Sequence, residues 1–343
     1  MQWPSERGDA SADEVAELQQ VWQASDLLHA VRLGCAHVAG RAAHVTVELE
    51  RIPAYAEALP LASMARPHHD PLTHYLGHGD DTLAYFITLD AINFGSGYFP
   101  CLHKRPGMSG YFTVASALND AFREHGPFAA EALAELSVED CTRVFGQDPG
   151  NRDIQELMRH FASALNALGR FLLERVDGSF VRLVESAQGS AAKLVSLLAG
   201  MAFFRDVEEY RGVPVPYLKR AQLTAADLAI AFDSSGPGRF DDLDRLTIFA
   251  DNLVPHVLRS DGILIYDRDL SDRIEGEEDI PAGSEQEIEI RACAVHAVEL
   301  LVQELLRQGR AATAMQLDYL LWNRGQTPHY KARRRHRTRT VFY

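Results

Sequence analysis

The chain has 343 residues, of which 46% are hydrophobic and 24% charged, and its formal net charge is −14. This composition is typical of a globular protein with one large core or two modest domains, and it excludes a disordered chain. The negative charge argues against a surface that coats polynucleotides, because clustered lysines and arginines bind phosphate backbones.

Neither a membrane span nor a secretory signal is expected. No apolar stretch reaches the roughly 18 residues that a span requires, and the N-terminal sequence lacks the basic and then apolar order of a signal peptide. We therefore expect a cytoplasmic protein with no membrane partner. The widely spaced cysteines contain no C-x-x-C motif, so we expect buried free thiols instead of disulfides or a zinc site.

Helical periodicity dominates the chain, and we predict a mainly α fold with a small β portion. The pattern Ser11-Ala-Asp-Glu14 is typical of a capping box that opens a helix. Further helices are expected over residues 151–176, 190–204, 224–232 and 284–308.

Strands are expected over residues 45–49, 83–89 and 179–183, where they would form a small sheet or hairpin. The chain has no internal repeat and no low-complexity linker. It is therefore expected to form a single compact unit, or two intimately packed lobes.

A histidine-rich segment follows Pro67. His68, His69, His74 and His78 lie among three aspartates, but their spacing matches no metal-ligand motif, and Pro and Gly interrupt the segment. We interpret it as a polar surface loop and expect no metal.

Small and aromatic residues alternate in Asn93-Phe-Gly-Ser-Gly-Tyr-Phe-Pro100. The segment matches neither the G-x-S-x-G elbow nor a phosphate-binding loop, which excludes serine hydrolases and nucleoside triphosphatases. It is either a tight turn with aromatic packing or one wall of a base pocket. In the pocket, Phe94 or Tyr111 would stack on a heterocycle, and Asn93 or Ser96 would bond its edge.

One carboxylate, Asp251, lies inside the apolar run 246–258, between Phe249 and Pro255. A carboxylate in such a run requires either a structural partner or a chemical task. The structural alternative is an aspartate that caps a helix beginning near Pro255.

Seven segments together resemble the queuosine salvage protein family, and they follow in order from about residue 85 to the end of the sequence. They are Leu89-Asp-Ala-Ile-Asn-Phe-Gly-Ser-Gly-Tyr-Phe99, Ser190-Ala-Ala-Lys-Leu194, Tyr217-Leu-Lys-Arg-Ala-Gln222, the run 246–258, Glu287-Ile-Glu-Ile-Arg291, Leu317-Asp-Tyr-Leu-Leu-Trp322 and Val341-Phe-Tyr343.

The resemblance implies a helix-hairpin-helix DNA-glycosylase-like architecture, mainly α with a small β portion. It also implies a hydrolase that cleaves the N-glycosidic bond of queuosine 5′-phosphate and releases queuine for salvage, without a cofactor or metal. The sequence contains no Leu-Pro-Gly-Val-Gly-like hairpin, so a mononucleotide is a more credible substrate than duplex DNA, and no stable nucleic-acid partner is expected.

The resemblance also implies roles for individual residues. Asp251 follows the Gly-rich turn 234–238 and corresponds to the glycosylase aspartate that stabilises the sugar cation, with Phe249 and Asn252 lining the pocket beside it. Asp318 would accept hydrogen bonds from the base edge or form a structural salt bridge. The candidates for binding the 5′-phosphate are Lys193, Lys219 and Arg205, each of which is otherwise a solvated cation.

Two further expectations concern the charged helix and the C-terminal segment. Glu287, Glu289 and Arg291 are expected to cap and pair within a helix, with a supporting role in the site left open. The alternative function is a non-catalytic binder of modified tRNA or of the free base, with the basic run 331–339 as an electrostatic handle. A disordered RNA-binding tail would contain few aromatic residues, so we expect residues 342–343 to pack into the body of the protein near the Asp318 helix. The arginines before them are expected to pair with the acidic region 267–289 or to lie on the surface.

Overall fold

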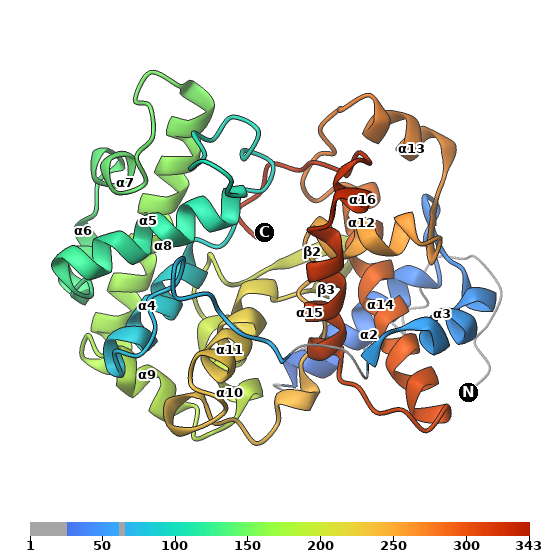
Figure 1. Ribbon diagram of the computed structural model, residues 1–343, viewed down its shortest axis with the longest axis horizontal. Helices are drawn as coiled ribbons and strands as arrows, with labels where there is room; N and C mark the ends of the chain where they lie inside the picture. Colours follow the sequence, from blue (N-terminus) through green and yellow to red (C-terminus); the bar gives the residue numbers. More distant parts are fainter. Residues whose placement is uncertain (1–25, 62–65) are drawn as a thin grey trace. The chain divides into compact units, whose positions relative to one another are not determined.

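The computed structural model describes residues 26–61 and 66–343. Helices predominate and two small two-stranded sheets accompany them (Figure 1), so the prediction of a mainly α fold with a small β portion is confirmed. The helix expected from Ser11 lies outside the described residues. Within residues 26–61 and 66–343, no helix is both long and apolar enough to cross a membrane.

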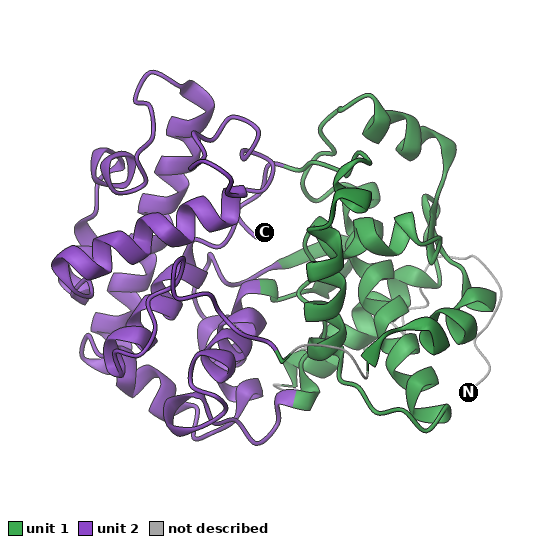
Figure 2. Ribbon diagram, viewed as in Figure 1, with its two compact units in different colours: residues 1–66, 207–219, 244–338 green, residues 67–206, 220–243, 339–343 purple. Residues whose placement is uncertain are grey.

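The chain divides into two compact units, each assembled from segments that are separated in the sequence (Figure 2). Of the described residues, unit 1 contains 26–61, 66, 207–219 and 244–338, and unit 2 contains 67–206, 220–243 and 339–343. Segments of unit 1 and unit 2 therefore alternate along the sequence.

Unit 1 is built around helix α14 (Glu285–Arg307). The Ser284 side chain accepts a hydrogen bond from the backbone of Glu287, which caps the helix as predicted, and Gln308 closes it. Helix α14 packs against helices on several sides and against the first strand. The other elements are α2 (Leu27–Ala39), β1 (Val45–Val47), η1 (Leu49–Arg51), α3 (Ile52–Ala58), β2 (Val207–Tyr210), β3 (Val213–Pro216), η4 (Leu243–Arg245), α12 (Leu253–Ser260), β4 (Leu264–Tyr266), α13 (Arg268–Glu275), α15 (Ala314–Gly325) and α16 (Pro328–Lys331).

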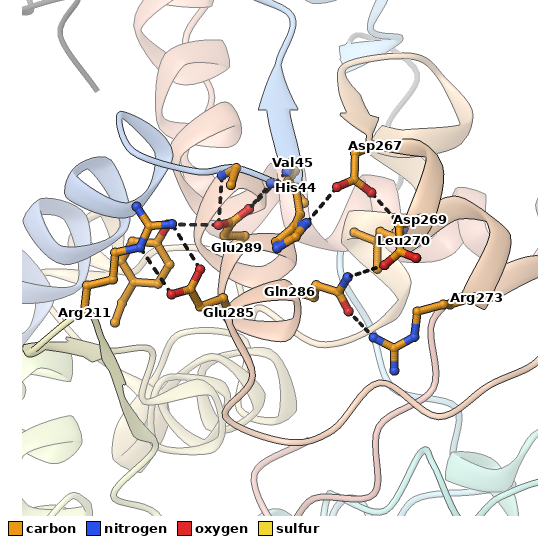
Figure 3. Close-up of polar contacts among 12 residues, drawn as sticks. His44, Val45, Arg211, Asp267, Asp269, Leu270, Arg273, Glu285, Gln286 and Glu289 are labelled. Atoms are coloured by element: carbon orange, nitrogen blue, oxygen red, sulfur yellow. Dashed lines mark hydrogen bonds and ion pairs between the residues drawn. The ribbon is translucent and has the colours of Figure 1, made fainter. Parts of the chain in front are cut away.

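Helix α14 carries three charged residues, Glu287, Glu289 and Arg291, that are at most 1% exposed. The Glu289 carboxylate accepts hydrogen bonds from the backbone N–H groups of Ala43, His44 and Val45, at 2.6–3.1 Å, and from the Tyr210 hydroxyl at 2.9 Å. Figure 3 shows this carboxylate beside His44 and Val45. One buried charge thereby holds the start of β1 and the end of β2 against the helix.

The strand predicted over 45–49 is present as β1, which pairs antiparallel with β4. The sequence missed the hairpin of β2 and β3. Its two-residue turn, Arg211-Gly212, has positive φ at both positions, as a type I′ turn requires. The prolines in β3 (Val-Pro-Val-Pro) concealed the strand, because proline normally argues against one.

Unit 2 is built around helix α8 (Arg152–Val176), whose predicted boundaries are confirmed, with Asn151 as its N-cap. Helices α4, α6, α7 and α9 pack against it. The remaining elements of unit 2 are α4 (Asp80–Ala91), α5 (Gly110–His125), α6 (Ala130–Glu135), α7 (Val138–Val144), α9 (Phe180–Ser186), α10 (Ala191–Leu198), α11 (Lys219–Ala231), which begins at the last residue of unit 1, and η3 (Gly236–Gly238).

Two strand predictions are wrong. Residues 83–89 belong to helix α4, in which every side chain from Thr82 to Ala91 is buried, so the apolar run shows no helical periodicity. Residues 179–183 include Ser179, which caps helix α9 by accepting a hydrogen bond from Arg182 N.

Two helix boundaries also differ from the prediction. Helix α10 ends at Leu198 instead of residue 204, and α11 begins at Lys219, five residues before the expected start at Thr224. Thr224 lies inside α11 and donates its hydroxyl to the Arg220 carbonyl oxygen at 2.9 Å, which is a back-bond and not a cap.

The description of residues 67–81 as a polar surface loop is wrong for His74, which is 2% exposed. Its imidazole stacks on Phe86 and shares a 3.0 Å hydrogen bond with the Tyr111 hydroxyl. The described residues include no group of three or more His, Cys, Asp or Glu side chains arranged to hold a metal ion. The four cysteines are free thiols, as predicted; Cys101 is half-buried and the others are buried.

The buried contacts of Glu289 lead to a stability prediction. The variant Glu289→Gln retains the volume but places an amide donor among N–H donors, so we expect the free energy of unfolding to fall by at least about 2 kcal/mol. The control Glu285→Gln changes a 48% exposed side chain that pairs with Arg211, and it should cost at most about 1 kcal/mol. Urea unfolding measures both, and equal losses would contradict the anchoring role.

Candidate active site

Asp251 lies immediately before helix α12 in unit 1. Its Oδ1 accepts hydrogen bonds from the backbone N–H groups of Leu253 at 2.7 Å and Val254 at 3.2 Å. These bonds fulfil the capping role that the sequence left open, because they satisfy donors in the first turn. Asp251 is half-buried, and within the part of the chain that the structure describes its Oδ2 accepts no hydrogen bond.

Asp318 lies on helix α15, where the sequence placed it, and its carboxylate faces the segment that carries Asp251. Asp318 Oδ1 accepts a 2.9 Å hydrogen bond from the backbone N–H of Phe249. Burial, and then the negative charge of Asp251, raises the pKa of Asp318 well above its ordinary value. The two carboxylates are therefore electrostatically coupled, and Asp318 favours its neutral form.

Lys219 opposes that effect, because its positive charge lowers the pKa of Asp318. The lysine is only 5% exposed and is the first residue of helix α11. Leu218, just before it, has a φ of +52° and is fully buried. A bulky residue in this region costs roughly 1–2 kcal/mol, and such strain is concentrated at functional sites.

Phe249 and Asn252 flank Asp251, and both are buried, at 7% and 5% exposure. Asn252 occupies the N-cap position of helix α12, but its side chain makes no capping hydrogen bond. Unit 1 thus brings together the predicted residues Phe249, Asp251, Asn252, Asp318 and Lys219.

The sequence missed one cation of this group, Arg335. The surrounding protein lowers the pKa of its guanidinium, and the charge of Asp251 acts in the opposite direction. Arg335 belongs to the basic run that the sequence presented as a handle for RNA, so no local signal connected it with Asp251.

A second group of predicted residues lies in unit 2, directly after helix α4. Phe94 is 2% exposed, packs edge-on against Phe161 and lies under the Arg220 guanidinium, whose Cζ is 4.7 Å from its ring centroid. Asn93 donates to Asp90 at 3.4 Å. The buried Ser96 Oγ has no hydrogen-bond partner among the described residues.

The other predicted residues of unit 2 lie apart from this turn. Tyr111 is on helix α5, where His74 shares its hydroxyl, and burial raises the pKa of the phenol. Lys193 is exposed on α10 and donates to Gln188 Oε1 at 2.7 Å. Arg205 is exposed in the segment after α10.

The C-terminal residues complete unit 2. Tyr343 is 2% exposed, and its carbonyl oxygen accepts a 2.9 Å hydrogen bond from Gly95 N, while Arg220 donates to the Val341 carbonyl at 2.8 Å. Gly95 has a φ of +97°, which only glycine adopts easily. The predicted burial of Tyr343 is confirmed, whereas Phe342 is only half-buried. Tyr343 contacts the turn after α4 in unit 2, whereas the prediction placed both aromatic residues near the Asp318 helix, which belongs to unit 1.

The basic run before the terminus pairs with acidic residues. Arg334 and Arg337 form ion pairs with Glu277 and Asp279, within the acidic region that the sequence proposed. Arg339 instead pairs with Asp153, at 3.0 Å.

Comparisons with known proteins agree with the resemblance seen in the sequence. A family model described as "Queuosine salvage protein" matches residues 73–343. A protein of Sphaerobacter thermophilus is 38% identical over 313 residues, which cover 89% of this chain and 95% of that protein. A Mus musculus protein is 31% identical over 327 residues, covering 89% of this chain and 96% of the relative.

A Dictyostelium discoideum protein is 33% identical over 265 residues, covering 76% of this chain and 78% of the relative. All three relatives carry the name queuosine 5′-phosphate N-glycosylase/hydrolase. The chain therefore belongs to the queuosine salvage protein family.

The raised pKa of Asp318 predicts a pH dependence of stability. Because the folded pKa exceeds the ordinary value of 3.8, the stabilising contribution of Asp318 is complete below that value and is lost as the pH rises through the folded pKa. Removing the ionisable group with Asp318→Asn should shift the free energy of unfolding in favour of the variant by up to about 1.4 kcal/mol per pH unit across this window. Asp272→Asn, at a side chain that is 72% exposed, is the control and should show no such trend. Parallel pH profiles of Asp318→Asn and wild type would contradict the raised pKa of Asp318.

Proposed function

We propose that this protein hydrolyses the N-glycosidic bond of queuosine 5′-phosphate, releasing queuine and ribose 5-phosphate. The observation that carries the proposal is the pair Asp251 and Asp318 in a family whose named relatives are N-glycosylase/hydrolases. Two coupled carboxylates with distinct surroundings supply the groups that glycoside hydrolysis requires.

In the proposed reaction, the bond between the anomeric carbon and the base nitrogen breaks, and its electron pair leaves with the base. The carboxylate of Asp251, held through Oδ1 by two backbone N–H groups, stabilises the positive charge that develops on the sugar through Oδ2. A water molecule then bonds to the anomeric carbon, and its proton passes to Asp251 or to solvent.

Asp318 is proposed as the group that faces the leaving base. Burial and the charge of Asp251 raise the pKa of Asp318 and so favour the protonated form, which can donate to the base as the electron pair departs. Phe249 and Asn252 are proposed to line the pocket beside Asp251. Asn93, Phe94, Ser96 and Tyr111, which belong to unit 2, stay predictions from the sequence. The chemistry uses side chains of this chain and calls for no cofactor.

We further propose that the architecture is of the helix-hairpin-helix DNA-glycosylase type. In support, Asp251 opens helix α12 after helix α11 and the turn at η3, the order in which glycosylases present their aspartate. The turn lacks the Leu-Pro-Gly-Val-Gly pattern, which favours a mononucleotide over duplex DNA.

The proposed role of Asp251 can be tested by substitution. Asp251→Asn should fold and lower the rate of queuine release from queuosine 5′-phosphate by at least about 100-fold, because the charge that stabilises the sugar cation is removed. Mass spectrometry measures free queuine, and circular dichroism checks the fold. Near-normal turnover would remove Asp251 from the mechanism.

The candidates for binding the 5′-phosphate make a second prediction. We expect Arg335→Met to lower the preference for the nucleotide over the nucleoside by about tenfold or more, because it removes a charge-assisted contact. Lys219→Met should impair both substrates, since Lys219 acts on Asp318. Lys193→Met and Arg205→Met, both at exposed positions of unit 2, test the remaining sequence candidates.

Arg333→Met is the matched control, because Arg333 is exposed like Arg335 but donates to the Ser260 carbonyl, whereas the charge of Asp251 acts on Arg335. Its substrate preference should equal that of the wild type. If Arg335→Met cleaves both substrates normally, the phosphate is bound elsewhere.

The alternative function, a binder of modified tRNA, predicts a different salt response. Tail-driven RNA binding would weaken steeply with salt, whereas turnover of a mononucleotide would change little. The ion pairs of Arg334 and Arg337 with acidic residues favour the hydrolase, because they neutralise part of the basic run.

A further inference from the structure

Arg291, on helix α14 of unit 1, contacts the two segments that carry the acidic and basic groups of the candidate site. Its side chain is 0% exposed. A buried guanidinium is stable only when several groups surround it in fixed directions. Its contacts with neighbouring segments therefore show which parts of the site it holds in place.

The first contact is with the segment of Asp251. Arg291 Nε donates a 3.0 Å hydrogen bond to the carbonyl oxygen of Ala250, the residue directly before Asp251. Ala250 is itself buried. Asp318 binds the same segment one residue earlier, through the N–H of Phe249. The backbone on the N-terminal side of Asp251 is thus fixed by two side chains, from α14 and α15.

The second contact is with the segment of Lys219. The Arg291 guanidinium lies over the Tyr217 ring, with Cζ 3.9 Å from the centroid. The Tyr217 hydroxyl donates to the Ile288 carbonyl at 2.8 Å, which fixes the ring on α14. The strained Leu218 connects this ring to Lys219. The ring therefore anchors the turn from which Lys219 emerges.

The third contact fixes the guanidinium itself. Arg291 NH1 lies 3.6 Å from Glu287 Oε1, one helical turn earlier, and the Glu287 side chain is 2% exposed. Glu287 Oε2 also accepts a hydrogen bond from Gly283 N at 3.3 Å. The Glu287 carboxylate neutralises the charge of Arg291 and restricts the side-chain conformations that the guanidinium can adopt.

We propose that Arg291, held by Glu287, is a positioning residue that keeps Asp251 and Lys219 at the places that the reaction requires. The planar guanidinium of Arg291 donates a hydrogen bond to Ala250 from its edge, through Nε, and stacks its face on the Tyr217 ring. Lysine offers a single point charge and cannot make both contacts. This inference rests on the proposed function, because it concerns the geometry of that site.

The test is a double-mutant cycle on queuosine 5′-phosphate hydrolysis. Arg291→Lys should lower kcat by about 10-fold to 100-fold, the effect of a displacement of about 1 Å, while KM changes by less than about threefold. In the Asp251→Asn background the same substitution should have a clearly smaller effect, of less than about threefold, because only the placement of Lys219 is left to disturb. A purely structural role would give the same fold-change in both backgrounds, and that result would overturn the proposal.

A matched control is available in unit 1. Arg32 pairs with Glu299 of α14 at 2.8 Å and donates to the Leu246 carbonyl at 3.3 Å, so it joins the same helix to the same segment further from Asp251. Arg32→Lys should leave kcat within about twofold of the wild type. A loss equal to that of Arg291→Lys would show that any such link matters, and would contradict a specific role.

A second variant keeps the test decisive if Arg291→Lys does not fold. Glu287→Gln retains the side-chain volume but removes the charge that faces the guanidinium, and it should lower kcat about threefold or more with KM nearly constant, again only when Asp251 is present. Unchanged kcat in this variant would overturn the proposal. Absence of queuine release by the wild type would instead refute the proposed function itself.

Discussion

Three charges buried on helix α14 impose a constraint that the rest of unit 1 has to satisfy. Glu287 and Arg291 lie one turn apart on one face of the helix and pair with each other, while Glu289 points to the opposite side. Each must find polar partners, because an unpaired charge cannot be buried. Backbone groups supply most of these partners. The segments before β1 and before Asp251 are consequently attached to the helix by charge and not only by apolar packing.

The same arrangement explains why the candidate site can be rigid although Asp251 and Lys219 lie in irregular segments. Loops usually move more than the elements they connect, and a site on loops loses precision unless side chains lock it. Here helix α14, which is capped at Ser284, provides the side chain of Arg291 that holds both segments. The site residues before α12 and at the start of α11 are therefore attached to a regular helix.

The sequence revealed those features whose signals are local. Helices α8 and α14 were found because each has an N-cap and a long apolar stripe, and Asp251 was found because a carboxylate interrupts an apolar run. Helix α4 was mistaken for a strand because burial on all sides erases periodicity. The hairpin of β2 and β3 was hidden by prolines, and by a type I′ turn made from Arg211-Gly212 instead of Asn-Gly. The sequence predicted the pairing of Arg291 within its helix, which is confirmed by its contact with Glu287. The bond from Arg291 to Ala250, the left-handed φ of Leu218 and the interaction of Arg335 with Asp251, 84 positions away, depend on the folded structure and carry no local signal.

The alternation of the two units along the chain has a consequence for the order of folding during synthesis. Domains commonly fold as soon as they leave the ribosome, beginning with the N-terminal one. Unit 2 includes residues 339–343, where Arg220 and Gly95 bind the backbone of Val341 and Tyr343. These contacts of unit 2 therefore cannot form until every described residue of unit 1 has been translated, so the last interactions of unit 2 form after the chain of unit 1 is complete.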